Sequence, residues 1–573
     1  MEHGERLGIV VRGSLADGLE ARLDGLSSVE DMRVGKFVKV RGEKHDFFCL
    51  VTDVKLDAAN DQVLADPPPE SEPFLRQVLA GTMTFGLVQV QPMLMLARDG
   101  AADDGIARHP GAAIDGAEDG PRPVRTIPTH FSTVFVADET DFERVFGAPG
   151  EDRFELGTPR DMDVPIRLNL RRFVERSNGV FGKSGTGKSF LTRLILCGTI
   201  RSRVAANLVF DMHSEYGWET QTEDGHFVKG LKQLFPGQVF VYTLDPGSSR
   251  NRSVRPDGEI TIGYDEIDVD DIALLSEELV LNPTAVESGS LAAQALGREW
   301  MRRLMEMDGE ALRAFCEQSG ANDASLSALR RKLISHLKPL PFLREHAEGR
   351  ALDEVIARLK GGQHVVLEFG QHRRLLPYML VANIITRKLH GLWITMMERY
   401  QQSQDAKDRP PQLMITMEEA HRFLNPSAAR QTSFGTIARE MRKFNVTLLV
   451  IDQRPSGIDA EVMSQLGTRI TAQLNDDRDL DAIFTGVSGA AKLRHTLASL
   501  DSREEAMILG HAVPMPVVFQ ARKYDEAFYA AINPFGAQRE AVNGGTPRLR
   551  LVEAGSPDPR AVDARDYETL FPD

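Results

Sequence analysis

The chain has little cysteine and no uninterrupted hydrophobic segment of membrane-spanning length. It contains three cysteines, Cys49, Cys197 and Cys316. They lie far apart and lack the spacing of metal ligands, which excludes a disulfide framework and indicates a reducing compartment. The first residues lack the apolar core of a secretion signal, and the apolar stretch at 380–397 is interrupted by Arg387, Lys388 and His390. We therefore expect a cytoplasmic protein.

Positive charge is outweighed by negative charge. The formal net charge of the 573 residues is −15, which argues against a general basic surface that coats nucleic acid. A localised basic channel is compatible with this balance, because attraction depends on where lysine and arginine lie. With 42% hydrophobic and 26% charged residues, the composition is typical of a soluble globular protein. The length predicts about three to four domain-sized units.

The stretch from Gly182 to Ser189 is typical of a loop that holds nucleotide phosphates. It fits G-x-x-x-x-G-K-[ST], in which glycines let backbone N–H groups point at the phosphates. A strand over 178–181 and an apolar helix over 190–200 give the order that the motif requires; a glycine-rich surface turn is the alternative. We expect Lys188 to reach the β- and γ-phosphates and Ser189 to ligate Mg²⁺. The predicted nucleotide-binding residues are Gly182, Lys183, Ser184, Gly185, Thr186, Gly187, Lys188, Ser189 and Phe190.

A second apolar segment, residues 413–417, ends in two carboxylates. Glu418 and Glu419 follow it directly. At the end of a buried strand, Glu418 would hold Mg²⁺ through water, and Glu419 would orient and deprotonate the attacking water. Glutamates are also favoured at a helix N-terminus by the helix dipole, and the two interpretations are compatible.

Two further predicted strands end in polar residues. The strand over 208–211 leads into Asp211 and Glu215, and the strand over 447–451 leads into Gln453. In a doubly wound fold the carboxyl ends of the strands line the ligand crevice. We therefore expect Gln453 near the γ-phosphate, and Asp211 and Glu215 near the metal or water. Ordinary turn formation is the alternative for all three.

The pattern along the chain predicts two fold types. Residues 1–145 contain short runs rich in β-branched and aromatic residues, which predicts a small barrel or sandwich, with a flexible insertion at 98–122. From about residue 150, buried strands alternate with apolar helices, as in a mostly parallel sheet covered on both faces. We predict an α/β core over 150–268 and 349–531, a helical insertion over 269–348 and a C-terminal extension over 532–573. The predicted core strands are 178–181, 208–211, 239–243, 364–369, 413–417, 447–451 and 469–473.

Five motifs together resemble the HerA/FtsK-like hexameric translocases, and HerA most closely. They stand at residues 182–189, 210–217, 417–423, 438–445 and 452–459, and the stretches at 464–470 and 500–510 are also similar. The resemblance covers most of the chain. It implies an N-terminal β-barrel, a RecA-like P-loop ATPase core and a helical insertion.

The chain departs from the family at one position. HerA proteins usually have Asp-Glu-Ala-His where this chain has Glu418 followed by Glu419, Ala420 and His421. The additional methylene shifts the carboxylate by about a bond length, which a water-mediated Mg²⁺ contact can absorb. Glu419 remains the predicted catalytic residue.

The resemblance also implies that a neighbouring subunit supplies an arginine to each nucleotide. The candidates are Arg442, beside Arg439 and Lys443, and Arg176 before the phosphate loop. Solvated charges on an exposed helix face are the alternative. Residues 370–374, Lys229 and Lys232 are candidates for DNA contact, and for these a solvated-loop role is equally compatible. Residues 370–374 are Gly370, Gln371, His372, Arg373 and Arg374.

By resemblance, the chain is an ATP- and Mg²⁺-dependent translocase or helicase. It would form a homohexamer around double-stranded DNA and act with a NurA-like nuclease in DNA repair, or with a sirtuin-like or other effector in antiviral defence. One alternative is a nucleotide-gated assembly platform that activates a partner enzyme. The acidic balance and the N-terminal β-domain, a plausible docking module, are compatible with it. A protein remodeller is the third alternative.

Overall fold

The computed structural model describes most of the chain up to residue 533. The described residues are 4–533 except 25–27, 60–70, 83, 99–119, 161, 222–224, 347–349, 373, 431–432, 488–492, 495–496, 499 and 501–503. The residues up to 524 form one compact unit, and a second unit begins at residue 525. In the second unit the structure describes helix α21 (Glu526–Ile532), which the side chain of Asp525 caps. No helix among the described residues is both long and apolar enough to cross a membrane.

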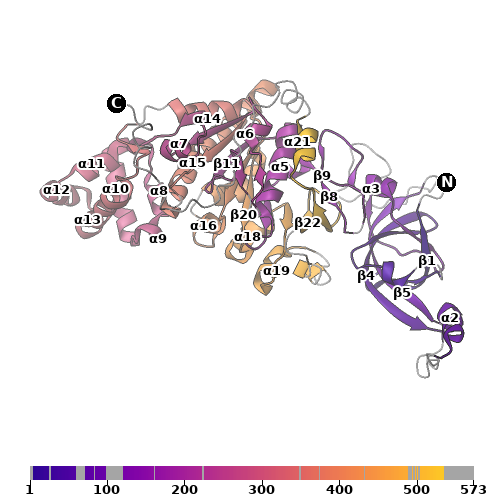
Figure 1. The fold of residues 1–573 in the computed structure, drawn as a ribbon. Helices are drawn as coiled ribbons and strands as arrows, with labels where there is room; N and C mark the ends of the chain where they lie inside the picture. Colours follow the sequence, from indigo (N-terminus) through magenta and orange to yellow (C-terminus); the bar gives the residue numbers. More distant parts are fainter. Residues whose placement is uncertain are drawn as a thin grey trace, which may run out of the picture. The chain divides into compact units, whose positions relative to one another are not determined.

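The N-terminal strands close into a barrel (Figure 1). Its strands are β1 (Arg6–Ser14), β2 (Gly18–Leu23), β3 (Phe37–Arg41), β4 (His45–Ala58), β5 (Thr84–Ala97) and β7 (Thr133–Val136). They pair in the order β2-β1-β7-β3-β4-β5, and pairing of β2 with β5 closes the ring; β6 (Arg122–Pro123) adds to β5. Buried apolar side chains such as Leu19, Val40 and Val90 fill the barrel. The expected small barrel is confirmed, while most of the predicted insertion at 98–122 lies outside the described residues.

Helix α3 (Glu139–Phe146) packs against the barrel wall. The ring of Phe142 lies 5.4 Å from that of Phe37 and 5.3 Å from that of Phe48, centroid to centroid. Beside them the Lys39 ammonium donates to both carboxylate oxygens of Asp141 at 2.7 Å. Both charged groups are buried, so each depends on the other for a partner. The remaining barrel elements are η1 (Val29–Asp31) and α2 (Pro73–Thr82).

A large, mostly parallel sheet forms the centre of the α/β part. Its order is β15-β14-β18-β11-β19-β20-β10-β21-β22-β23-β8-β9, parallel from β15 to β21 and antiparallel beyond. Its central strands read as continuous apolar runs and are buried along their whole length, as strands covered on both faces must be. The strands are β8 (Arg153–Thr158), β9 (Ile166–Asn169), β10 (Asn178–Phe181), β11 (Ala206–Asp211), β14 (Val239–Thr243), β15 (Gly258–Glu259), β18 (His364–Glu368), β19 (Leu413–Glu418), β20 (Val446–Asp452), β21 (Thr468–Thr471), β22 (Glu505–Gly510) and β23 (Val517–Ala521).

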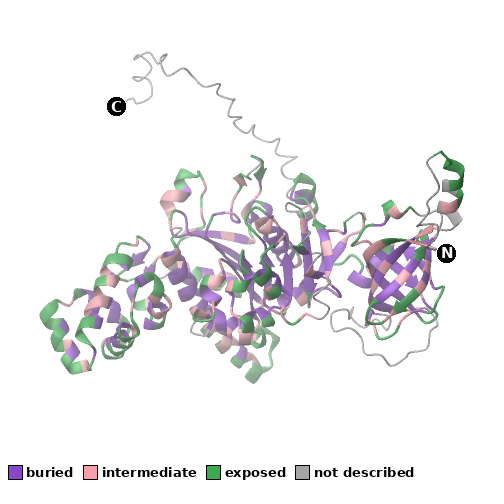
Figure 2. Cartoon of the chain, turned by 90° about the horizontal axis from the view of Figure 1, so that it is seen from below, coloured by how far each residue is buried: buried purple, intermediate pink, exposed green. Residues whose placement is uncertain are grey.

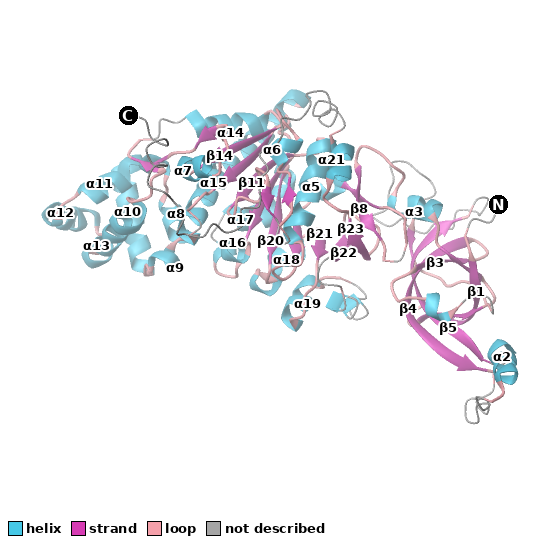
Figure 3. Cartoon of the chain, viewed as in Figure 1, coloured by secondary structure: helices cyan, strands magenta, loops and turns pink. Residues whose placement is uncertain are grey.

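Helices surround this sheet (Figure 3). They are α4 (Leu170–Val174), α5 (Lys188–Ser202), α6 (Leu231–Leu234), α7 (Pro246–Asn251), α14 (Arg350–Lys360), α15 (Leu375–Ser403), α16 (His421–Leu424), α17 (Ser433–Glu440), α18 (Ala460–Gln465) and α19 (Asp477–Ile483). Short 3₁₀ turns are η5 (Ala406–Asp408), η6 (Ala428–Arg430), η7 (Met441–Phe444) and η8 (Pro455–Gly457). Two small strand pairs, β12 (Thr220–Gln221) with β13 (Phe227–Val228) and β16 (Ile262–Gly263) with β17 (Leu343–Arg344), lie outside the sheet.

Between β16 and β17 the described chain is helical. The elements are η2 (Tyr264–Glu266), α8 (Val269–Leu274), α9 (Ser276–Leu279), α10 (Pro283–Leu296), η3 (Gly297–Glu299), α11 (Trp300–Glu306), α12 (Gly309–Ser319), α13 (Asp323–Lys332) and the π-helical turn η4 (Leu333–Leu337). Figure 2 shows that these helices expose one side and bury the other, as amphipathic helices do. The buried side includes Trp300, Leu304 and Leu326.

Candidate active site

The phosphate-loop sequence connects the carboxyl end of β10 to the first turn of α5. Gly182, Gly185 and Gly187 have φ angles of +149°, +76° and +89°, a region that side chains disfavour. A Cβ on Gly182 would lie 2.7 Å from the Thr186 hydroxyl oxygen. That hydroxyl instead donates to the Lys183 carbonyl at 2.7 Å. The glycines therefore allow a tight turn whose N–H groups and helix N-terminus face an anion site.

Lys188 lies at the start of α5, and its ammonium donates to the Lys183 carbonyl at 2.6 Å. Burial lowers the pKa of Lys188, while the negative charges of Glu419, Asp452, Glu418 and Glu215 oppose that shift. The carboxylates at the ends of β19 and β20 thus act on the same ammonium. Phosphate oxygens are natural partners for a cation held in this way.

Glu418 ends β19 and is buried. One carboxylate oxygen, Oε1, accepts a hydrogen bond from the Tyr216 hydroxyl at 3.0 Å, while Oε2 has no hydrogen-bond partner in the described part of the chain. Burial and the charges of Asp211 and Glu215 raise the pKa of Glu418 well above its usual range. A buried carboxylate oxygen without a partner needs a donor or a cation. Glu418 therefore fits a hard, oxygen-preferring cation such as Mg²⁺, and Ser189 stays a predicted second ligand.

Glu419 follows in a left-handed conformation, with φ +51°. For a residue with a Cβ this backbone costs about 1–3 kcal/mol and persists only where the surroundings hold it. Its Oε1 accepts from the Gln453 side-chain amide at 3.4 Å, and its Oε2 lies 3.8 Å from Nδ1 of His421. Glu419, predicted to activate the attacking water, and Gln453, predicted to lie near the γ-phosphate, are therefore neighbours.

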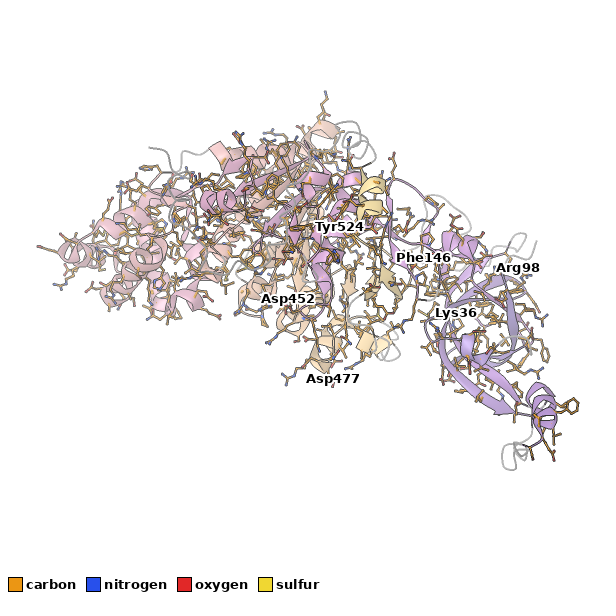
Figure 4. The ribbon with its side chains drawn as sticks, in the orientation of Figure 1. Lys36, Arg98, Phe146, Asp452, Asp477 and Tyr524 are labelled. Atoms are coloured by element: carbon orange, nitrogen blue, oxygen red, sulfur yellow. The ribbon has the colours of Figure 1, made fainter. Side chains whose placement is uncertain are left out.

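Asp452, labelled in Figure 4, links the ends of β19 and β20. Its carboxylate accepts from the His421 backbone N–H at 2.7 Å and contacts His421 Nδ1 at 2.9 Å. The hydrogen bond to Asp452 raises the pKa of His421. This pair fixes the turn that carries Glu419 against the strand that carries Gln453.

Asp211 organises the loop that follows β11. Its two oxygens accept from the backbone N–H groups of Glu215 at 2.8 Å, Tyr216 at 2.8 Å and Gly217 at 3.3 Å. Asp211 is fully buried, and burial together with the charge of Glu368 raises its pKa to about 7. This geometry favours a structural role for Asp211 over the predicted catalytic one. The Glu215 carboxylate lies near enough to act on Glu418 and Lys188.

The two candidate arginines lie at the other edge of the sheet. Arg176 precedes the amino end of β10, and Arg442 in η7 precedes that of β20, which pairs in parallel with β10. Burial and the charge of Arg442 lower the pKa of Arg176, so the two guanidinium groups are neighbours. The length of β10, about 13 Å for four residues, separates this edge from the chain's own phosphate loop.

The candidate DNA contacts are scattered. Lys232 forms an ion pair with Asp257 at 2.8 Å and lies over the Phe240 ring. The backbone of Gln371 donates to Asp245, while Arg373 lies outside the described residues. Lys232 and Gln371 thus contact Asp257 and Asp245 rather than the group around Lys188.

Four residues of this site were not assigned roles from sequence: Tyr216, Tyr378, His421 and Asp452. The sequence motifs do include Tyr216, His421 and Asp452. Their roles in positioning the site follow from the hydrogen bonds described here. Tyr378 carries no local signal, because it lies in the apolar helix α15. Its hydroxyl donates to the Glu418 carbonyl at 3.0 Å and accepts from the Glu418 N–H at 3.1 Å.

The strand order gives the site its class. β20 lies between β10, which leads into the phosphate loop, and β19, which ends in Glu418. The carboxyl ends of these parallel strands bring Lys188 and the carboxylates together. The chain is a P-loop ATPase with a RecA-like core.

Comparison with known proteins agrees with this class. Residues 154–389 match the family model "Helicase HerA, central domain", and residues 7–75 match "HAS barrel domain". The chain is similar to HerA helicases in its central part and carries a HAS-barrel-like N-terminal domain. It is 23% identical over 411 residues to the DNA double-strand break repair helicase HerA of Pyrococcus furiosus, covering 66% of this chain and 71% of that protein.

A second HerA protein is similar over a comparable length. The DNA double-strand break repair helicase HerA of Saccharolobus solfataricus is 22% identical over 392 residues, covering 68% of this chain and 72% of the relative. Among solved structures, VirB4 of Thermoanaerobacter pseudethanolicus aligns with a TM-score of 0.41 at 14% identity, over 65% of this chain and 97% of the other.

Proposed function

We propose that this chain is an ATP-driven translocase of double-stranded DNA. The observation that carries the proposal is the convergence of Lys188, Glu418, Glu419 and Gln453 at the N-terminus of α5. The relatives named above are DNA double-strand break repair helicases, which supports DNA as the substrate.

Each residue then has a defined task. Backbone N–H groups of 182–189 and the Lys188 ammonium bind the phosphates, and Ser189 and Glu418 hold Mg²⁺. When bound, Mg²⁺ neutralises charge on the phosphate oxygens. Glu419 accepts a proton from the attacking water, and the Gln453 amide orients the same region.

The positions of Arg176 and Arg442 support a ring. Both precede the amino ends of strands whose carboxyl ends bear the nucleotide site, so neither is placed to serve the site of its own chain. In a homohexamer, this edge would face the nucleotide of the next subunit, where the guanidinium groups would stabilise developing charge. Double-stranded DNA would pass through the central channel.

An effector enzyme is the remaining part of the proposal. We expect a NurA-like nuclease or a sirtuin-like enzyme to act with the ring.

One observation favours the alternative of an assembly platform. Leu56 and Phe74 on the barrel are 80% and 78% exposed, and exposed apolar residues of this size suit a docking surface.

Glu419→Gln tests the ATPase. The amide cannot accept the proton, so ATP hydrolysis should fall by about 10²–10⁴-fold while ATP binding is retained. Binding is measured by fluorescence titration and turnover by phosphate release. Wild-type turnover should also rise on adding duplex DNA at low salt, where backbone contacts are strongest. An ATPase indifferent to duplex DNA under those conditions contradicts the translocase.

The same variant separates the motor from the platform. After the partner is identified by co-purification, its activity is measured with wild type and with Glu419→Gln. Loss of partner activity in the variant supports the motor. Retained activity in a ring that binds but does not hydrolyse ATP supports the platform.

A further inference from the structure

Three neighbouring strands end in buried carboxylates. Asp211 on β11 pairs in register with Glu368 on β18, and on the other side of β11 the strand β19 ends in Glu418. Their side chains are almost fully buried. Carboxylates this close destabilise one another unless each has its own partner.

Each carboxylate has a different partner. Glu368 forms an ion pair with Arg252, with 3.3 Å between Nη1 and Oε1. Asp211 accepts from three backbone N–H groups of the following loop, including that of Tyr216. The Tyr216 hydroxyl donates to Oε1 of Glu418. These contacts extend from Arg252, which follows α7, through Glu368 and Asp211 to the predicted Mg²⁺ ligand Glu418.

We propose that Tyr216 is a positioning residue for the Mg²⁺ site: its hydroxyl holds Oε1 of Glu418 and leaves Oε2 for the metal or its water. This inference rests on the ATPase proposed above. A phenol donates one hydrogen bond, and this one goes to the carboxylate. Asp211, by fixing the Tyr216 backbone, determines where the hydroxyl lies.

The length of the Glu418 side chain makes this hydrogen bond important for the metal site. A glutamate has one more rotatable bond than an aspartate, so its carboxylate has more conformations to lose on binding a cation. A hydrogen bond to Oε1 removes much of that freedom beforehand, which is the way in which outer partners of metal ligands act.

Tyr216→Phe is the test, because it deletes one oxygen from a fully buried side chain. We measure binding of a fluorescent ATP analogue over a range of Mg²⁺ concentrations and in EDTA. The Mg²⁺ concentration for half-maximal binding should rise about two- to tenfold, as expected for the loss of one hydrogen bond. Affinity in EDTA should not change. The Mg²⁺ dependence of hydrolysis should shift in parallel.

Tyr378→Phe is the matched control. Tyr378 is equally buried and also contacts Glu418, but only through the backbone N–H and carbonyl. It should lose thermal stability and keep the wild-type Mg²⁺ dependence. In a Glu418→Ala background, Tyr216→Phe should have no further effect on Mg²⁺ dependence, since it acts through that carboxylate.

Several outcomes overturn the proposal. One is a Tyr216→Phe protein that melts like wild type and has unchanged Mg²⁺ dependence. Another is an equal shift in Tyr378→Phe, or a full additional shift in the Glu418→Ala background. If wild type shows no Mg²⁺-dependent nucleotide binding at all, the ATPase assignment fails instead, and the role of Tyr216 fails with it.

Discussion

At the residue scale, burial decides the protonation state of single side chains. His364 begins β18 and is 4% exposed; its Nδ1 accepts from the Asn207 backbone N–H at 3.2 Å. Burial, with a smaller contribution from the charge of Arg203, lowers the pKa of His364 to about 4. In the folded protein the imidazole therefore stays neutral at pH values at which an exposed histidine begins to take up a proton.

This predicts an acid-dependent loss of stability. Below about pH 6.5 the unfolded chain binds a proton at His364 that the folded chain does not, so stability falls as the pH falls toward about 4. Over that window the loss is on the order of 3 kcal/mol. Calorimetry at about pH 7.5 and pH 5.5 should show His364→Asn losing about 1–2 °C less in melting temperature than wild type. An identical loss in both proteins contradicts the prediction.

The Asn side chain is chosen because its Oδ1 can replace Nδ1 as the acceptor for Asn207. A variant without that acceptor would leave a buried N–H unpaired and lower stability at every pH. The difference between the two pH values, rather than the absolute melting temperature, is therefore the readout.

At the element scale, α15 holds the helical segment through a group of charges. Arg387 on α15 contacts Asp271 of α8 at 2.8 Å, and Asn383 donates to the same carboxylate at 2.7 Å. Asp271 is fully buried, and burial raises its pKa despite these partners. The neighbouring Lys388 forms an ion pair with Glu266.

Arg387→Met should therefore loosen α8 from α15. It leaves the Asp271 charge buried with only neutral partners, the Asn383 amide and the Asp268 backbone N–H, a loss of up to about 3 kcal/mol. We expect a lower melting temperature and faster proteolytic cleavage within residues 269–348. Arg302→Met is the control, because Arg302 pairs with Glu299 and Glu306 on the helix surface. Equal cleavage of the two variants contradicts the anchoring role of Arg387.

At the scale of the whole molecule, the separation of Arg442 from its own phosphate loop predicts complementation. Lys188→Ala removes the phosphate-binding ammonium, and Arg442→Ala removes the group offered to a neighbour; each alone should lose most hydrolysis. Subunit exchange between the two variants should restore part of the ATP hydrolysis. In a mixed ring, the intact Lys188 of an Arg442→Ala subunit can face the intact Arg442 of a Lys188→Ala subunit. Phosphate release by the mixture is compared with the sum of the separate proteins.

No recovery in rings shown to contain both variants contradicts a site shared between subunits. Arg302→Ala mixed with Lys188→Ala serves as the reference, since Arg302 lies on the surface of the helical segment. The ring number and the partner remain proposals, as does the division into residues 1–145, 150–268, 269–348, 349–531 and 532–573.

Much of the sheet could be predicted from its apolar runs. The predicted 178–181 and 239–243 coincide with β10 and β14, and the other core predictions match strands to within about two residues. β2, β8 and β9 were missed, because they contain charged residues at alternate positions and few β-branched ones. The apolar strands β22 and β23 were also not predicted. β2 and β8 each pair with one strand near in sequence, β1 and β9, and with one distant strand, β5 and β23. Pairing with a distant strand leaves no local pattern.

The candidate site also has parts that the sequence predicts and parts that only the structure shows. The sequence by itself determined the phosphate loop, since its glycine conformations and its lysine depend on spacing within eight residues. It also determined that Glu418, Glu419 and Gln453 follow buried strands. Only the tertiary structure decided which of these groups meet, because strand order places β20 between β10 and β19. The hydrogen bond from Tyr216 to Glu418 and the distant edge for Arg176 and Arg442 follow from that order, which local chemistry does not encode.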